Sequence, residues 1–195
     1  MTHKITMKRR MSVVNNIIDL CGYCDSDYAA DLDTRRSRTG FVFYLLGNYI
    51  GSQSKLQQSV ALSTAESEFC SVVLATTFAM WAMQWIVELG FELNKPVIIY
   101  SDNKSCIAIA RNANINFKYS KHIDVRQMFI REIIAKGDIS VLYVKTNLNI
   151  SDGLTKPLGK ANFRKFRDEL TGNVNVVGEI TTDEIETSLA QVFEQ

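Results

Sequence analysis

Short apolar runs alternate with longer stretches of helical periodicity along the first 170 residues of the chain. Runs typical of strands lie at 18–25, 41–46, 49–54, 97–100 and 139–144. Apolar residues at helical spacing predict helices at 65–90, 103–111, 121–136 and from Ser151 to about 170, with a kink near Pro157. The predicted order of elements is therefore β-β-β-α-β-α-α-β-α.

This order predicts an α/β fold with one five-stranded mixed sheet and helices on both faces. Three strands in succession are expected to pair antiparallel, and two later strands separated by helices to run parallel to the first. Residues 18–172 then form the folded domain. Residues 1–17 hold basic but no acidic side chains and predict a tether, whereas 173–195 holds acids but no Lys or Arg and predicts a flexible tail.

Composition narrows the class of protein. With 46% hydrophobic and 22% charged residues the chain is globular rather than disordered. No uninterrupted apolar run reaches the roughly 18 residues of a membrane span, and no signal peptide is visible, so we expect a soluble intracellular protein without a membrane partner. Cys21 and Cys24 have the spacing of a zinc half-site. No second pair follows, and positions three apart on a strand face opposite sides, so all four cysteines are expected to be free thiols.

Acidic residues occur where this scheme brings several elements to one edge of the sheet. Asp25 ends the first predicted strand and Asp102 follows the fourth, and the carboxyl ends of parallel strands meet at the same edge. Asp152 begins the last helix, and Glu66 and Glu68 lie in the first turns of the long helix. These two glutamates point about 200° apart, so both cannot reach one site, and the apolar stripe does not choose between them.

Clustered carboxylates repel one another unless cations lie between them. Oxygen ligands favour Mg²⁺ or Mn²⁺ over zinc, and two such ions about 3.5–4 Å apart can stabilise both the attacking water and the leaving oxygen of a phosphodiester. Taken singly, each acid is better explained by a structural role, in helix capping or in balancing the helix dipole, than by catalysis. Their joint placement indicates metal-assisted phosphodiester cleavage.

Several motifs follow one another in the order and spacing of a known family. They are GYCDSDYA at 22–29, ALSTAESEF at 61–69, YSDN at 100–103, KHIDVR at 121–126 and SDGLTKPL at 151–158. Over about 21–172 the chain resembles the ribonuclease H domain of copia-type LTR retrotransposon Pol polyproteins. The resemblance implies a ribonuclease-H-like fold and an endonuclease that hydrolyses the RNA strand of RNA–DNA hybrids during reverse transcription.

The same resemblance implies a set of site residues and partners. It makes Asp25, Glu68, Asp102 and Asp152 the catalytic ligands of two Mg²⁺ or Mn²⁺ ions. The expected partners are an RNA–DNA hybrid and the reverse transcriptase domain of the same polyprotein, in a cytoplasmic virus-like particle or in the nucleus. The isolated domain is expected to be a monomer.

Contacts with nucleic acid are assigned to four further residues, namely Asp27, Arg35, Asn103 and Lys156. One alternative stays open, which is a catalytically inactive or domesticated fragment that binds nucleic acid or a polymerase partner. It is motivated by Gly153, where many relatives have a larger apolar residue, and by a thin basic surface. An integrase-type transposase is disfavoured, because its acids run in the order Asp, Asp, Glu.

Overall fold

The computed structural model describes residues 17–112 and 121–171. Its strands are β1 (Ile17–Ile18), β2 (Leu20–Asp27), β3 (Arg38–Leu45), β4 (Asn48–Leu56), β5 (Glu92–Leu93), β6 (Val97–Ser101) and β7 (Ile139–Tyr143). Its helices are α1 (Thr64–Glu88), α2 (Lys104–Arg111), α3 (Lys121–Ala135), α4 (Asp152–Thr155) and α5 (Lys160–Leu170), with a 3-10 turn η1 (Thr146–Leu148). Of the predicted tether at 1–17, residues 1–16 lie outside the described residues, as does the predicted tail at 173–195.

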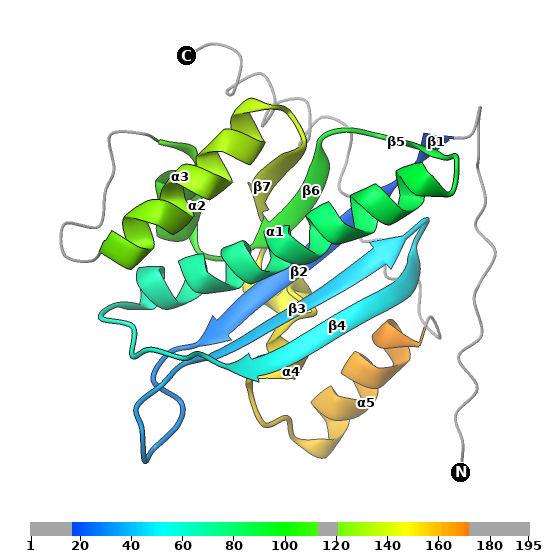
Figure 1. Cartoon of the computed structure of the whole chain (residues 1–195). Helices are drawn as coiled ribbons and strands as arrows, with labels where there is room; N and C mark the ends of the chain where they lie inside the picture. The colour runs from blue at the N-terminus through cyan, green and yellow to red at the C-terminus, as the bar shows by residue number, and fades with distance from the viewer. Residues whose placement is uncertain (1–16, 113–120, 172–195) are drawn as a thin grey trace.

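The main sheet has five strands in the order β4-β3-β2-β6-β7 (Figure 1). β2, β3 and β4 pair antiparallel, while β6 runs parallel to β2 and β7 runs parallel to β6. The predicted mixed sheet and the predicted strand directions are therefore confirmed. β2 and β6 are neighbours, which is the relationship that determines where their terminal acids lie.

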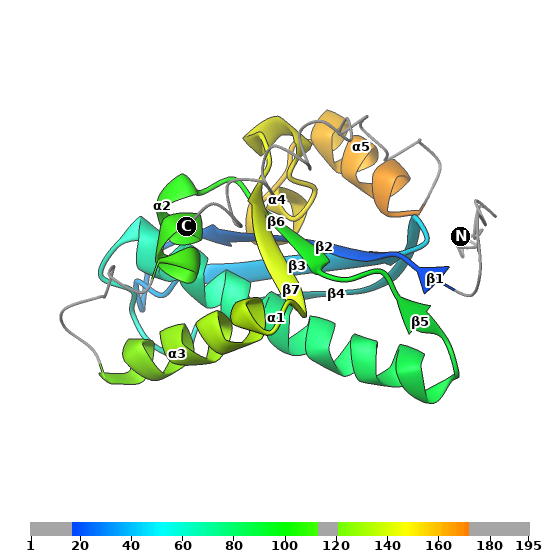
Figure 2. The same ribbon diagram turned by 90° about the horizontal axis from the view of Figure 1, so that it is seen from above.

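Helices cover both faces of this sheet (Figure 2). α1, α2 and α3 pack on one face, where the main core includes Phe43 from the sheet, Phe69 from α1 and Ile130 from α3. On the other face Phe166 and Leu170 of α5 pack against a smaller cluster around β3. The sheet therefore has two buried faces, in agreement with the near-continuous apolar runs of its central strands.

Two local features differ from the sequence-based expectation. β2 continues two residues beyond Asp25, because the ladder with β3 persists to the last residue of the strand. A two-stranded parallel sheet of β1 and β5 was not predicted. The division of the last helix into α4 and α5 agrees with the kink or restart expected near Pro157, since Lys156 precedes that proline and adopts an extended backbone (φ −117°, ψ 145°). All four cysteines are free, as predicted.

Candidate metal centre

The candidate centre lies at the edge of the sheet where β2 and β6 end. Asp25, near the end of β2, is only 1% exposed. Asp102 directly follows β6, which runs parallel to β2, so the two carboxylates leave neighbouring strands at the same edge. Two acids that are 77 residues apart in the sequence are brought together in this way.

α1 brings a third carboxylate to this edge. Glu68, in the second turn of α1, is 5% exposed. One carboxylate oxygen from each of Asp25, Glu68 and Asp102 lies within 4.8 Å of the other two. Three of the four acids that the sequence predicts as ligands are therefore gathered into one cluster, which we call the carboxylate cluster.

Glu66 has a different role, at the start of the helix. Ser63 Oγ accepts a hydrogen bond from the Glu66 backbone N–H (3.1 Å), and Glu66 Oε2 accepts one from the Leu62 backbone N–H (2.7 Å). Ser63 therefore caps α1, and Glu66 holds the residue before the cap in place. Glu66 is occupied at the helix start, and Glu68 reaches the cluster.

The carboxylate cluster has the chemistry of a divalent cation site. Within the described part of the chain, Glu68 Oε2 is a buried oxygen without a hydrogen-bond partner. Burial, reinforced by the charges of Asp25 and Asp102, raises the pKa of Glu68 from 4.5 to about 9. Burial also raises the pKa of Asp25 from 3.8 to about 6. A divalent cation would give the orphaned oxygen a partner and offset the repulsion, so the cluster is compatible with divalent metal binding.

Asp152, the fourth predicted acid, lies beside the cluster and contacts a lysine. Lys156 Nζ is 2.8 Å from Asp152 Oδ1 and 3.7 Å from Asp25 Oδ2. Asp152 is the first residue of α4 and is half-buried. The structure thus links Asp152 to Asp25 through an ammonium group, while the mutually close set contains only the other three acids.

The residues predicted to contact nucleic acid have different surroundings. Asp27 is the half-buried last residue of β2, and Arg35 is exposed in the loop between β2 and β3. Asn103 caps α2, because its side-chain oxygen accepts a hydrogen bond from the Cys106 backbone N–H (2.9 Å). Lys156 contacts the acids described above. Arg35 is therefore the residue of this set most open to a ligand, and Lys156 lies within 4 Å of a carboxylate of the cluster.

Sequence reasoning missed two polar side chains that fix the centre. Thr155 donates a hydrogen bond to the Asp25 carboxylate. Asn149 donates through Nδ2 to the Cys24 carbonyl (3.0 Å), one residue before Asp25, and its Oδ1 accepts from the Ser151 hydroxyl (2.5 Å). Ser151 was predicted to cap the last helix, and its hydroxyl bonds to Asn149 instead. No spacing rule in the sequence marks these contacts, since they join segments about 125 residues apart.

Gly153, next to Asp152, is explained by packing within this chain. A Cβ at position 153 would lie 2.3 Å from Cδ2 of Phe166 on α5. Only a residue without a side chain lets the Phe166 ring lie this close to α4. The glycine is therefore a requirement of the contact between α4 and α5.

Retrotransposon proteins are similar to this chain in sequence. It is 39% identical over 153 residues to the retrovirus-related Pol polyprotein from transposon TNT 1-94 of Nicotiana tabacum. This alignment covers 78% of this chain and 11% of that protein. The chain is 32% identical over 168 residues to the Pol polyprotein from transposon RE1 of Arabidopsis thaliana, covering 86% of this chain and 11% of that protein. The chain thus spans about a ninth of the length of these relatives. No protein-family model matches the chain.

Solved ribonuclease H structures are similar to it in fold. LC11-RNase H1, solved in complex with an RNA/DNA hybrid, superposes with a TM-score of 0.50 at 12% identity, over 70% of this chain and 93% of that one. The N-terminal RNase H domain of rv2228c from Mycobacterium tuberculosis gives a TM-score of 0.51 at 10% identity, over 80% and 99%. The chain is a ribonuclease-H-like domain related to copia-type retrotransposon Pol polyproteins. The fold and family implied by the sequence motifs are therefore confirmed.

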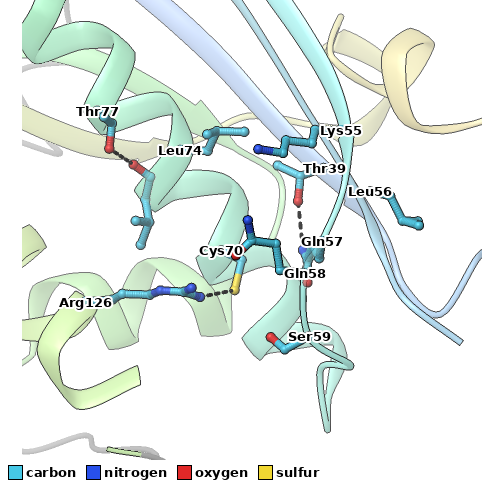
Figure 3. Close-up of a pocket in the computed structure, with 11 residues that line it drawn as sticks. Thr39, Lys55, Leu56, Gln57, Gln58, Ser59, Cys70, Leu74, Thr77 and Arg126 are labelled. Carbon is cyan, nitrogen blue, oxygen red and sulfur yellow. Dashed lines mark hydrogen bonds between the residues drawn. The ribbon is translucent and has the colours of Figure 1, made fainter. Parts of the chain in front are cut away.

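The described part of this ribonuclease-H-like domain also contains a pocket of about 170 Å³ (Figure 3). It is lined by the end of β4 and the residues after it, by α1 and by α3. Arg126 of α3 donates to Cys70 Sγ (3.3 Å) on one side, and Gln57 bonds to Thr39 on the other. None of the three clustered carboxylates lines this pocket.

One described helix, α1, is long and apolar enough to cross a membrane by length and composition alone, with a mean hydropathy of 1.5 in its most apolar window. In this domain α1 packs along the sheet, and Phe69, Val72, Ala75 and Ala79 lie in the main core. Its apolar character is that of a central core helix, and no membrane contact is indicated.

Proposed function

We propose that this domain is an endonuclease that hydrolyses the RNA strand of RNA–DNA hybrids, with two Mg²⁺ or Mn²⁺ ions held by Asp25, Glu68, Asp102 and Asp152. The carboxylate cluster with its orphaned Glu68 oxygen, at the carboxyl edge of a ribonuclease-H-like sheet, is the observation that carries the proposal. When bound, the ions would supply Lewis-acid stabilisation of the attacking water and of the 3′ leaving oxygen.

Neighbouring side chains of the domain hold the acidic ligands in place and balance their charge. Asp25 is held in place by the Thr155 hydroxyl, and Glu68 by its position on a capped helix. In the metal-free chain the Lys156 ammonium offsets part of the charge of Asp25 and Asp152. With cations bound at these acids, the same ammonium would be available to contact a phosphate of the substrate.

The proposed path of the nucleic acid crosses this edge of the sheet. Arg35 in the exposed loop would contact a backbone phosphate, and Asn103 at the start of α2 and Asp27 at the end of β2 flank the cluster. On α5, Lys165 lies 3.7 Å from Glu169 and Arg167 contacts Asp168. These pairings occupy two of the basic side chains of α5, and Arg35, which is exposed in the loop, is the phosphate contact that we propose.

We further propose that the domain works within a Pol polyprotein, beside its reverse transcriptase, in a cytoplasmic virus-like particle or in the nucleus. The support is the similarity to retrotransposon Pol polyproteins, of which the matching segment is a small part. Removal of the RNA strand from a hybrid is the step that reverse transcription requires of such a domain. The isolated domain is expected to run as a monomer in light scattering.

The test is cleavage of a hybrid labelled on its RNA strand, with Mg²⁺ or Mn²⁺ and with EDTA. The parent chain is expected to cut the RNA only when metal is present. Asp102→Asn is expected to lower the rate by at least about 100-fold, because even changes at residues that only orient metal ligands cost up to that much. Asp138→Asn is the matched control, because Asp138 pairs with Lys95 on the surface.

Two results would contradict this proposal. One is an Asp102→Asn variant that cuts as fast as the parent, which would remove the site assignment. The other is a folded parent chain that binds the hybrid yet leaves its RNA intact with either metal, which would support the binding-only alternative.

A further inference from the structure

One side-chain amide links three elements at the edge that holds the carboxylate cluster. Gln57 follows the last residue of β4, and its Nε2 donates to Thr39 Oγ1 on β3 (2.8 Å). The same nitrogen donates to the Ser67 carbonyl (3.0 Å) and approaches Ser67 Oγ (3.3 Å) on α1. Ser67 Oγ in turn donates to Ser26 Oγ on β2 (2.8 Å). We call this chain of hydrogen bonds the Gln57 relay.

The relay joins the residues next to two of the clustered acids. Ser26 directly follows Asp25 on β2, and Ser67 directly precedes Glu68 on α1. Both serines are almost fully buried, at 4% and 0% exposure, so their bonds are shielded from competing water. A shift of the Gln57 amide would therefore be passed directly to the backbone that carries both acids.

Such a link matters because the acids repel one another in their charged form, which is the form that binds a cation. Their oxygens lie within 4.8 Å of one another, and this repulsion tends to separate the end of β2 from α1. The Ser67–Ser26 bond opposes that separation, and Gln57 ties Ser67 to Thr39 on β3. The base of the amide is itself fixed, because the Gln57 backbone N–H donates to the Ser37 carbonyl (2.8 Å).

We propose that Gln57 is a positioning residue of the metal centre, which acts through Ser67 and Ser26 to hold Asp25 and Glu68 at metal-binding separation. This inference rests on the proposed function, since it assumes that the cluster binds divalent cations. Gln57 contacts neither the acids nor the substrate. Its effect is therefore on the geometry of the centre rather than on the reacting groups.

The test compares Gln57→Met with Gln58→Met. Methionine keeps the length of the side chain but cannot donate, and Gln58 is an exposed neighbour on the same loop. Titration calorimetry with Mn²⁺ is expected to show about 10-fold weaker binding for Gln57→Met and no change for Gln58→Met, in the range found for residues that orient metal ligands. In hybrid cleavage, kcat is expected to fall while KM for the hybrid stays within about 2-fold.

A second control distinguishes a general loss of stability from a specific displacement of Asp25 and Glu68. Ile133→Val removes one methylene from the main core on α3, away from the relay. It is expected to lower resistance to urea without changing Mn²⁺ affinity. If Gln57→Met does not fold, Ser67→Ala tests the same chain of hydrogen bonds, because it removes the hydroxyl that bonds to Ser26.

The double variant Gln57→Met with Ser67→Ala is expected to bind Mn²⁺ little more weakly than Ser67→Ala alone, since the relay is already broken. Equal Mn²⁺ affinity for the Gln57→Met and Gln58→Met variants would overturn the inference. A loss of affinity matched by Ile133→Val would overturn it as well. If the parent chain binds Mn²⁺ but does not cut the hybrid, the proposed activity fails while the affinity comparison still tests the role of Gln57.

Discussion

Gly40 on β3 lies directly opposite Asp25 on β2, at the point where α4 packs on the sheet. A Cβ at position 40 would be 2.8 Å from Leu154 Cβ and 2.9 Å from Thr155 Cγ2. This close approach lets Thr155 reach the Asp25 carboxylate. The absence of a side chain at Gly40 on β3 therefore lets α4 pack close enough for Thr155 to contact Asp25 on β2.

Gly40→Ala is expected to push α4 away from the sheet and to separate Thr155 from Asp25. Overpacking of this kind costs about 1–3 kcal/mol, which urea unfolding would measure, and Mn²⁺ affinity should fall as well. Gly159→Ser is the matched control, because nothing lies within 4 Å of the added Cβ and serine is at least as favourable as glycine at the N-cap of α5. Unchanged stability in Gly40→Ala would show that α4 is not held at this distance.

Gly153→Ala is expected to collide with Phe166 and to destabilise the contact between α4 and α5 by a similar amount, about 1–3 kcal/mol. The collision predicts a rescue. Adding Phe166→Leu should recover part of the loss, so that the double variant is more stable than the sum of the two single effects predicts. Strict additivity in urea unfolding would contradict this account of Gly153.

Thr155→Val removes the hydroxyl that donates to Asp25 while keeping the shape of the side chain. A hydrogen bond to a carboxylate favours its charged form, so the loss is expected to raise the pKa of Asp25 further above about 6. The pKa can be followed by NMR titration of the metal-free carboxyl. Thr77→Val, on the exposed side of α1, should leave it unchanged.

The metal-free domain is expected to lose stability as the pH rises. Burial raises the pKa of Glu68 from 4.5 in the unfolded chain to about 9 in the fold. The fold keeps this proton after the unfolded chain has released it, so the contribution is full below pH 4.5 and declines toward pH 9, by at most about 1.4 kcal/mol per pH unit.

Urea unfolding at pH 5, 7 and 9 would show this decline. Glu68→Gln should remove most of it between pH 7 and pH 9, because glutamine does not ionise, while the raised pKa of Asp25 still contributes between pH 5 and about 6. Saturating Mg²⁺ should flatten the decline in the parent chain, since the cation stabilises the charged form. A metal-free parent that is equally stable at all three pH values would contradict the burial of a protonated Glu68.

The apolar runs along the chain, together with the rules for connections between strands, were sufficient to predict the five strands and their directions. That β2 and β6 are neighbours became clear only from the structure. The choice of Glu68 over Glu66 came from family resemblance, although the sequence held a physical signal for it. Ser63 and Glu66 have the spacing of a capping box, which assigns Glu66 to the helix start.

The rest depends on contacts between distant segments. Gln57 follows a predicted strand and looks like an ordinary loop residue until β3 and α1 surround it. Thr155 and Asn149 acquire their roles only when α4 and η1 fold against β2. Hydrophobic periodicity carries no information about such polar partners, because it records which face is buried and not what lies opposite.

The central claim is that the carboxylate cluster binds divalent cations. Anomalous diffraction from crystals of the parent chain soaked in Mn²⁺ tests it most directly. We expect anomalous peaks bounded by Asp25, Glu68 and Asp102, with Lys156 withdrawn from Asp25, and no such peaks in crystals of Asp102→Asn. The account would be contradicted if crystals soaked in saturating Mn²⁺ showed no anomalous peak at the carboxylate cluster and Lys156 still contacted Asp152.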